Sequence, residues 1–256
     1  MLARLRALLF LAVAAATVIP WSLIVLAASV TPPTTRYRIA ARWTRLATHA
    51  GRVICGVTWR VEGWHNLPQG PAILLPKHQS TWETFWLPSE MPRRLSFVYK
   101  RELHWIPFFG WAMASLGMIN IDRSKGANAF EQVVSQGAEH LRNGWWIVIF
   151  PEGTRTPPGA TRRYKTGGSR LAVRTGVPVV PIAVNSGELW PRGPLIRRAG
   201  EITVSIGAPI ETAGRTVDQV AFEVERWIEA EMRRLAPHRY GSRDSKAASR
   251  DAAATA

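Results

Sequence analysis

The sequence is short of cysteine and of acidic residues. Cys55 is the single cysteine among 256 residues, which excludes an internal disulfide framework and a cysteine-based metal cluster. Eighteen Asp and Glu stand against 33 Lys and Arg, giving a formal net charge of +15. This imbalance indicates an anionic partner: nucleic acid, an anionic membrane surface or a phosphorylated substrate.

Other common signatures are also missing. Neither G-x-x-x-x-G-K-[ST] nor G-x-G-x-x-G occurs, so the usual nucleotide-binding loops are absent. His49, His65, His104, His140 and His238 have no motif context, and no pair of them has metal-ligand spacing. A content of 46% apolar and 20% charged residues excludes a disordered chain and a coiled coil. Twelve tryptophans, a residue favoured at the membrane–water boundary, are many for this length.

Charged residues are absent between Arg6 and Arg36. The apolar run 8–30 has 23 residues, which as a helix at about 1.5 Å per residue would cover about 34 Å, enough to cross a hydrocarbon core of about 30 Å. A cleaved signal peptide is the alternative, because Ala27, Ala28 and Ser29 are small. Its apolar region normally spans only about 7–15 residues, so we predict a retained membrane anchor.

Pro20 lies within this run and predicts a kink in a continuous helix. Residues 35–57 mix arginines with aliphatic and aromatic side chains, as a basic amphipathic segment at the headgroup level does. A helix pair that dips into one leaflet is therefore an alternative to a spanning helix, and residues 35–57 are alternatively a surface helix of the folded domain. The greater positive charge after the run favours a cytoplasmic position for the rest of the chain.

Beyond Gly56, short apolar runs alternate with helical stretches. We expect strands at 57–61, 72–75, 95–99, 146–150, 179–184 and 202–206, and helices near 81–90, 126–142, 167–175 and 216–235. This alternation predicts an α/β fold with a mixed, largely parallel sheet flanked by helices. The chain then divides into an N-terminal membrane anchor with a basic amphipathic helix (1–56), an α/β domain (57–236) and a flexible tail (237–256).

His78 directly follows the strand expected at 72–75, where α/β folds place ligand-binding turns, and Glu83 comes five residues later. A carboxylate that accepts one ring N–H fixes the tautomer of an imidazole. It also stabilises the imidazolium formed when the other nitrogen takes a proton. Taken alone, this spacing often arises by chance. Lys77, beside the histidine, is expected either to face a phosphate or to be solvated.

A second polar segment follows the strand expected at 146–150. Residues 150–155 have the sequence Phe-Pro-Glu-Gly-Thr-Arg. Such a turn presents backbone N–H groups, and the planar guanidinium of Arg155 suits a phosphate. Arg162, Arg163 and Lys165 follow it, and the glycines at 167 and 168 open a predicted helix whose amides add affinity for an anion.

Together these segments resemble the glycerolipid acyltransferases, the family related to bacterial 1-acyl-sn-glycerol-3-phosphate acyltransferase. The first block of that family, His-x-x-x-x-Asp, is matched by His78 with Glu83 in the acid position, and the third block is residues 150–155. The second block is matched by Lys100, Glu102, Leu103, Pro107, Gly110, Asp122 and Arg123, and the fourth by 177–181. All four blocks occur in order.

The resemblance implies a reaction at His78. This histidine would deprotonate the free hydroxyl of lysophosphatidic acid, which attacks an acyl thioester to give phosphatidic acid, while Glu83 orients and charge-balances the imidazole. It also implies a substrate-binding group consisting of Lys100, Arg123, Glu152, Gly153, Thr154, Arg155 and Lys165. No metal or organic cofactor is expected, because a thioester is already activated. The donor would be acyl-carrier protein or coenzyme A loaded with the acyl group, and the basic face would attract anionic phospholipid and an acidic carrier protein.

The expected location is the bacterial inner (cytoplasmic) membrane, with the catalytic domain facing the cytoplasm. Glu83 departs from the family's Asp, which leaves an inactive lipid-binding module as an alternative. Another alternative is an acyltransferase that acts on glycerol 3-phosphate, a lysophospholipid or lyso-ornithine lipid. Nucleic-acid binding would explain the net charge but neither the anchor nor the His–acid turn.

The cysteine and four tryptophans carry further expectations. Cys55 lies in an apolar stretch with no adjacent base, so we expect a buried structural thiol rather than a nucleophile. Four tryptophans flank the predicted site and are expected to line an acyl-chain groove, to meet the bilayer or to pack in the core. They are Trp82, Trp86, Trp105 and Trp111.

Overall fold

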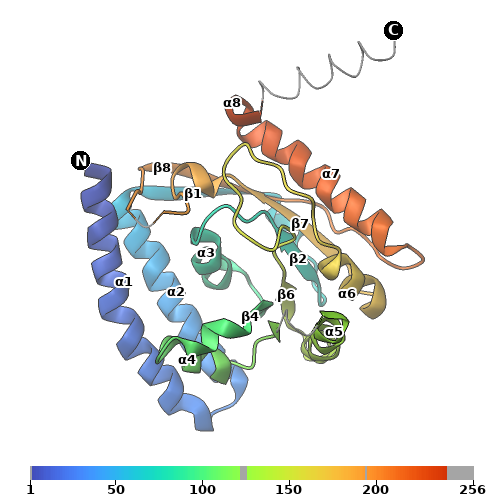
Figure 1. The fold of residues 1–256 in the computed structure, drawn as a ribbon, viewed down its shortest axis with the longest axis horizontal. Coiled ribbons are helices and arrows are strands. Elements are labelled where there is room, and N and C mark those ends of the chain that lie inside the picture. Colours follow the sequence, from blue (N-terminus) through green and yellow to red (C-terminus); the bar gives the residue numbers. More distant parts are fainter. Residues whose placement is uncertain (1, 122–125, 194, 241–256) are drawn as a thin grey trace.

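The computed structural model describes residues 2–121, 126–193 and 195–240, and a six-stranded sheet forms its centre (Figure 1). The strand order is β1-β8-β7-β2-β6-β3, and all neighbours are parallel except β7 and β8. The bounds are β1 Val57–Glu62, β2 Ile73–Pro76, β3 Leu95–Phe97, β6 Trp146–Val148, β7 Val179–Val184 and β8 Gly200–Ile206. The predicted α/β fold with a mixed, largely parallel sheet is confirmed.

Helices cover both faces of this sheet (Figure 1). One face carries α3 (Trp82–Glu90) and the N-terminal helices, and the other carries α5 (Gly126–Arg142), α6 (Gly167–Thr175) and α7 (Val217–Leu235). Successive strand residues alternate between the two cores: Leu74 packs on the α3 side, and Ile73 on the side of α5–α7. Burial on both faces explains why these strands are apolar throughout in the sequence.

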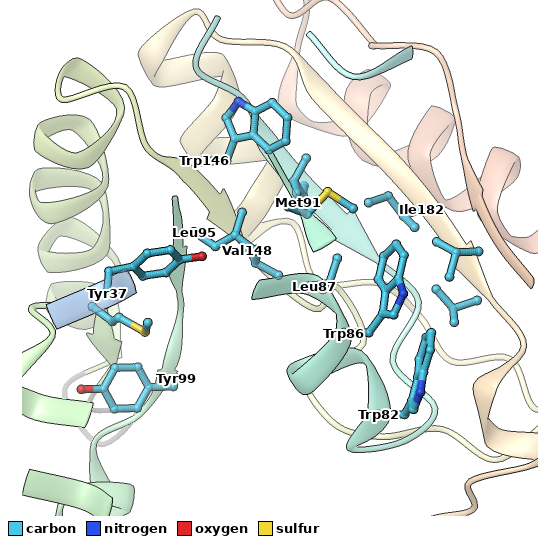
Figure 2. Close-up of a cluster of buried hydrophobic side chains, with 14 of the residues drawn as sticks. Tyr37, Trp82, Trp86, Leu87, Met91, Leu95, Tyr99, Trp146, Val148 and Ile182 are labelled. Carbon is cyan, nitrogen blue, oxygen red and sulfur yellow. The ribbon is translucent and has the colours of Figure 1, made fainter. Parts of the chain in front are cut away.

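The core on the α3 side is rich in tryptophan (Figure 2). Trp82 and Trp86 are each 1% exposed, and their rings stack with centroids 5.5 Å apart. Trp146 of β6 is also buried, and its indole N–H donates to the carbonyl of Gly70 at 2.8 Å. Buried indoles thus anchor α3, and with it the loop that precedes α3, to the sheet.

Helices α1 (Leu2–Ala27) and α2 (Pro33–Cys55) form an antiparallel hairpin through the 3-10 helix η1 (Ala28–Val30). The indole N–H of Trp21 donates to the carbonyl of Ile39 at 2.7 Å, and the indole N–H of Trp43 to Thr17 Oγ1 at 3.2 Å. Residues 2–30 are apolar and long enough to cross a membrane, a test that signal sequences and core helices also pass. Although Pro20 predicts a kink, α1 continues past it to Ala27.

The region between β3 and α5 departs most from the prediction. The strand expected at 95–99 divides into β3 and β4 (Tyr99–Lys100), and β4 pairs with β5 (Asn120–Ile121) in a separate two-stranded sheet. The 3-10 helix η3 (Arg101–Trp105) and α4 (Phe109–Ser115) are not part of the prediction. They pack beside the α1–α2 hairpin, and α4 contacts α1 (Figure 1).

The C-terminal end of the described chain is a helix. Thr216 and Gln219 form a reciprocal capping box at the start of α7. The flexible tail expected from residue 237 instead begins as α8 (Pro237–Tyr240), where Tyr240 is 6% exposed because it packs into the core under α7. The rest of the predicted tail, 241–256, lies outside the described residues.

Candidate active site

His78 lies in the loop between β2 and α3, held between an aromatic ring and a carboxylate. Its ring stacks on Phe150, with centroids 3.8 Å apart and an interplanar angle of 19°. Its Nδ1 lies 3.7 Å from Glu83 Oε2 and has no hydrogen-bond partner among the described residues. Hydrogen bonds of catalytic groups are often long before substrate binds. The structure thus brings the predicted pair together, at slightly more than hydrogen-bond distance.

Glu83 is 1% exposed and is fixed by donors from the surrounding loops. It accepts the backbone N–H groups of Gln79 at 3.0 Å and Ser80 at 3.1 Å, and also the hydroxyls of Ser80 and Ser186. These donors hold the Glu83 carboxylate in one position next to the His78 ring.

The Phe-Pro-Glu-Gly-Thr-Arg segment lies against the histidine loop. Glu152 Oε1 accepts the backbone N–H of His78 at 3.1 Å, and the Thr156 N–H donates to the His78 carbonyl at 2.8 Å. Burial is the main effect that raises the pKa of the Glu152 carboxyl, and the charge of Lys77 opposes it. The first and third sequence blocks therefore form one structural unit around His78.

A cavity of about 850 Å³ opens beside His78. One part of its wall is polar and includes Lys100, Gly153, Thr154, Arg155 and Lys165. The other part is apolar and comes from the N-terminal hairpin, α3, η3 and α4; examples are Val18, Trp21, Val25, Phe85, Leu103 and Met113. One space thus joins a titratable histidine, a group of cations and a long apolar surface.

The cations of this wall are not used elsewhere in the described structure. Lys100, Arg155, Lys165 and Arg192 line the cavity, and none of their side chains makes a hydrogen bond or ion pair with a described residue. Lys165 approaches Gly153, whose φ of 68° favours glycine. Cations clustered without carboxylates provide a site for an anionic group such as a phosphate.

Comparison with known proteins identifies the family. The model of the acyltransferase family matches residues 58–185. The chain belongs to this family. It is 41% identical over 238 residues to a 1-acyl-sn-glycerol-3-phosphate acyltransferase of Pseudomonas aeruginosa, which covers 91% of this chain and 92% of that relative. An enzyme of the same name from Saccharomyces cerevisiae is 32% identical, covering 73% of this chain and 63% of the yeast protein.

A solved acyltransferase has the same fold. The crystal structure of the LPA acyltransferase PlsC from Thermotoga maritima matches with a TM-score of 0.74 and 24% identity, covering 90% of this chain and 95% of the other. The predicted family is confirmed, and so is the prediction that the chain is an acyltransferase enzyme.

The acyltransferase site does not bring all the predicted residues to the cavity. Glu152 is 0% exposed and lies behind the wall, where it contacts the backbone of His78 rather than a substrate. Arg123 lies outside the described residues. Lys77, expected to face a phosphate or solvent, does neither: it is fully buried and pairs with Glu152 and Glu229.

Three residues of the site are absent from the prediction. Ser186 follows β7 and donates to Glu83, Arg192 lines the cavity, and Glu229 on α7 pairs with Lys77. A serine two residues after a strand end is a usable signal for Ser186. Nothing local to Glu229 marks it, because it lies 152 residues from its partner.

The tryptophans and the cysteine of the acyltransferase can now be placed. Trp82 and Trp86 are core residues, whereas Trp105 and Trp111 are 84% and 50% exposed. None of the four lines the cavity. Cys55 is 0% exposed, which confirms a buried thiol, and burial raises its pKa.

Proposed function

We propose that the protein transfers an acyl group from an acyl thioester to the sn-2 hydroxyl of 1-acyl-sn-glycerol 3-phosphate, producing phosphatidic acid for phospholipid synthesis. The observation that carries this proposal is the cavity, where His78, unpaired cations and an apolar wall share one space. The curated relatives named 1-acyl-sn-glycerol-3-phosphate acyltransferases support this acceptor.

His78 acts as the general base. Its Nδ1 faces Glu83, which leaves Nε2 to take the proton of the acceptor hydroxyl. The hydroxyl oxygen attacks the thioester carbonyl carbon, and the tetrahedral intermediate collapses with cleavage of the C–S bond. The imidazolium then returns its proton to the leaving thiolate. A positioned base contributes about 10²–10⁴-fold, and Glu83 stabilises the charge that develops on the ring.

Lys100, Arg155 and Lys165 hold the acceptor phosphate, with Gly153 and Thr154 shaping the adjacent turn. Arg192, on the same cavity wall, adds a fourth positive charge. Charge-assisted hydrogen bonds to phosphate are strong, and the arginine fork fits two phosphate oxygens. The apolar part of the wall then accommodates acyl chain.

The reaction needs no metal or organic cofactor in this proposal, because the thioester is already activated. The donor is acyl-carrier protein or coenzyme A carrying the acyl group. A net charge of +15 supports either donor, since both are anionic and are attracted by a basic surface.

The enzyme works at a bilayer surface, with the α1–α2 hairpin inserted into one leaflet of the cytoplasmic membrane and the catalytic domain on the cytoplasmic side. The two helices are tied together by Trp21 and Trp43, and α1 exposes Leu5, Leu9 and Ile24. A paired hairpin fits this reading better than a lone spanning helix, because α2 also packs on α3 of the catalytic domain. The acceptor would then enter the cavity from the leaflet.

Arg155→Gln tests the phosphate site. We expect the KM for lysophosphatidic acid to rise about 10–100-fold, because a hydrogen bond to a charged group is worth about 1.5–3 kcal/mol. The native protein should also prefer lysophosphatidic acid to a monoacylglycerol, and the variant should lose much of this preference. Radiolabelled product formation measures both.

The matched control is Arg142→Gln, which removes an exposed cation at the end of α5 that does not line the cavity. It should leave unchanged both the KM for lysophosphatidic acid and the preference for this acceptor over a monoacylglycerol. The phosphate site would be rejected if the native protein acylated a monoacylglycerol as fast as lysophosphatidic acid. Faster transfer to lyso-ornithine lipid than to lysophosphatidic acid would also reject it.

A further inference from the structure

Lys77, next to the catalytic histidine, has its side chain in a buried cluster of ionisable groups. Its Nζ lies 2.5 Å from Glu229 Oε1 and 3.5 Å from Glu152 Oε1, and Lys77 and Glu152 are each 0% exposed. The hydroxyl of Tyr164 donates to Glu229 Oε1 at 2.8 Å and lies 3.5 Å from Nζ. The cluster therefore joins the end of β2, the loop after β6, the segment before α6, and α7.

One ammonium group serves two carboxylates in this cluster. Nζ faces Oε1 of both residues, while Glu152 Oε2 and Glu229 Oε2 have no hydrogen-bond partner among the described residues. Other ionisable groups face the cluster: Tyr240 on α8, Glu225 and Arg233 on α7, and His78 itself. The cluster borders the apolar core under α7, and burial strengthens interactions between charges.

The cluster reaches the reacting histidine through Glu152. One and the same oxygen, Oε1, faces Lys77 and accepts the backbone N–H of His78 at 3.1 Å. The backbone N–H of Lys77 donates to the carbonyl of Ile182 on β7 at 2.8 Å, which fixes the other side of the loop. The position of the His78 backbone thus depends on where the lysine holds Glu152.

We propose that Lys77 and Glu229 are positioning residues for acyl transfer: Glu229, on α7, draws the Lys77 ammonium away from Glu152 so that Glu152 keeps its hydrogen bond to His78. The ammonium is shared between the two carboxyl groups and does not belong to Glu152 alone. The negative charge of Glu229, near the reacting loop, favours the imidazolium that forms when His78 takes the hydroxyl proton. The proposal rests on the role of His78 in the proposed function.

Glu229→Gln is the decisive variant, since it keeps the size of the side chain and removes one negative charge. We expect kcat to fall on the order of 10-fold, because small displacements of a catalytic group are costly, with the KM for lysophosphatidic acid unchanged. A neighbouring negative charge favours the protonated form of a base, and this variant removes one. The acidic limb of the kcat/KM profile, where the base becomes protonated, should therefore move to lower pH.

Lys77→Met should shift the same limb in the opposite direction. It removes a positive charge that disfavours protonation of the base, so the limb should move to higher pH. Glu223→Gln, also on α7, is the matched control: its ion pair with Arg215 at 2.5 Å is partly exposed, and no hydrogen bond or ion pair joins Glu223 to the cluster among the described residues. It should change neither kcat nor the pH profile. If Lys77→Met does not fold, the kcat and pH profile of Glu229→Gln still test the proposal.

Full-length protein in phospholipid vesicles is assayed with lysophosphatidic acid from acid to alkaline pH, and the thermal midpoint is recorded for each variant. The proposal would be overturned if Glu229→Gln lowered the thermal midpoint but had the same kcat and the same acidic limb as the control Glu223→Gln. The cluster would then only stabilise the fold. Failure of the proposed function is distinct: native protein would not acylate lysophosphatidic acid, or His78→Ala would retain activity.

Discussion

Glu83 occupies the acid position of the His-x-x-x-x-Asp block with one methylene more than Asp. The longer side chain is accommodated because Gln79, Ser80 and Ser186 all donate to its carboxylate, which ends 3.7 Å from Nδ1 of His78. The substitution therefore preserves a positioned charge beside the imidazole. This favours an active enzyme over the alternative of an inactive lipid-binding module.

Glu83→Gln should lower kcat on the order of 10²-fold, because the imidazolium loses its counter-charge. Binding of lysophosphatidic acid, measured as KM or by lipid-binding titration, should hardly change. The kcat of Glu83→Asp should lie between those of the native protein and Glu83→Gln. The matched control on α3 is Glu90→Gln, which we expect to leave turnover unaffected. Equal losses of turnover and lipid binding in Glu83→Gln would make Glu83 a structural residue instead.

At this scale the sequence predicts the contact of two side chains in one loop, but it misses the buried partners that distant segments supply to that loop. His78 and Glu83 are five positions apart across one strand-to-helix turn, so their contact follows from local geometry. Ser186 donates to Glu83 from 103 residues away, and Glu229 reaches Lys77 across 152. Such pairs depend on strand order, which the sequence pattern leaves open.

At the scale of elements, α4 and η3 extend the apolar surface of the N-terminal hairpin. Trp105, Ile106 and Trp111 are exposed there, and α4 contacts α1. Tryptophan is favoured at the membrane–water interface. These exposed side chains and the hairpin lie on one side of the molecule, opposite α7 (Figure 1), and we propose that this side faces the membrane.

A fluorophore placed by Ile106→Cys should be quenched by nitroxide-labelled lipids in anionic vesicles. Cys55 is fully buried, which leaves the introduced thiol as the reactive one. Phe222→Cys is the matched control, since Phe222 is 69% exposed on α7, on the other side of the sheet. We expect several-fold stronger quenching at 106 than at 222. Equal quenching at both positions would contradict this membrane orientation.

The sequence predicts helices well where the apolar repeat extends over several turns and where glycine marks a helix end. The helices at 126–142 and 167–175 have the bounds that the sequence predicts, and Gly176 ends the second in a left-handed conformation. Helix α4 has only seven residues and follows Phe108, a non-glycine residue with φ of 60°. A helix this short has too little periodicity to detect, and the turn before it carries no glycine signal.

At the scale of the whole molecule, the cavity is assembled from segments far apart in the chain. Its wall includes Val18 of α1, His78 after β2, Leu103 of η3 and Arg192 beyond β7. The sequence blocks predict the polar part of this wall, because each block follows a strand or a turn. The apolar part could not be predicted, since it depends on how the hairpin packs against α3 and α4.

In the proposed function, this cavity performs acyl transfer with His78 as its base. The most direct test measures transfer of a labelled acyl group, from acyl-carrier protein or coenzyme A, to lysophosphatidic acid in vesicles containing the full chain. His78→Ala should lose about 10²–10⁴-fold of the rate, while His65→Ala, an exposed histidine outside the cavity, should match the native protein. Undiminished transfer by well-folded His78→Ala, or no native transfer from either donor, would contradict the account.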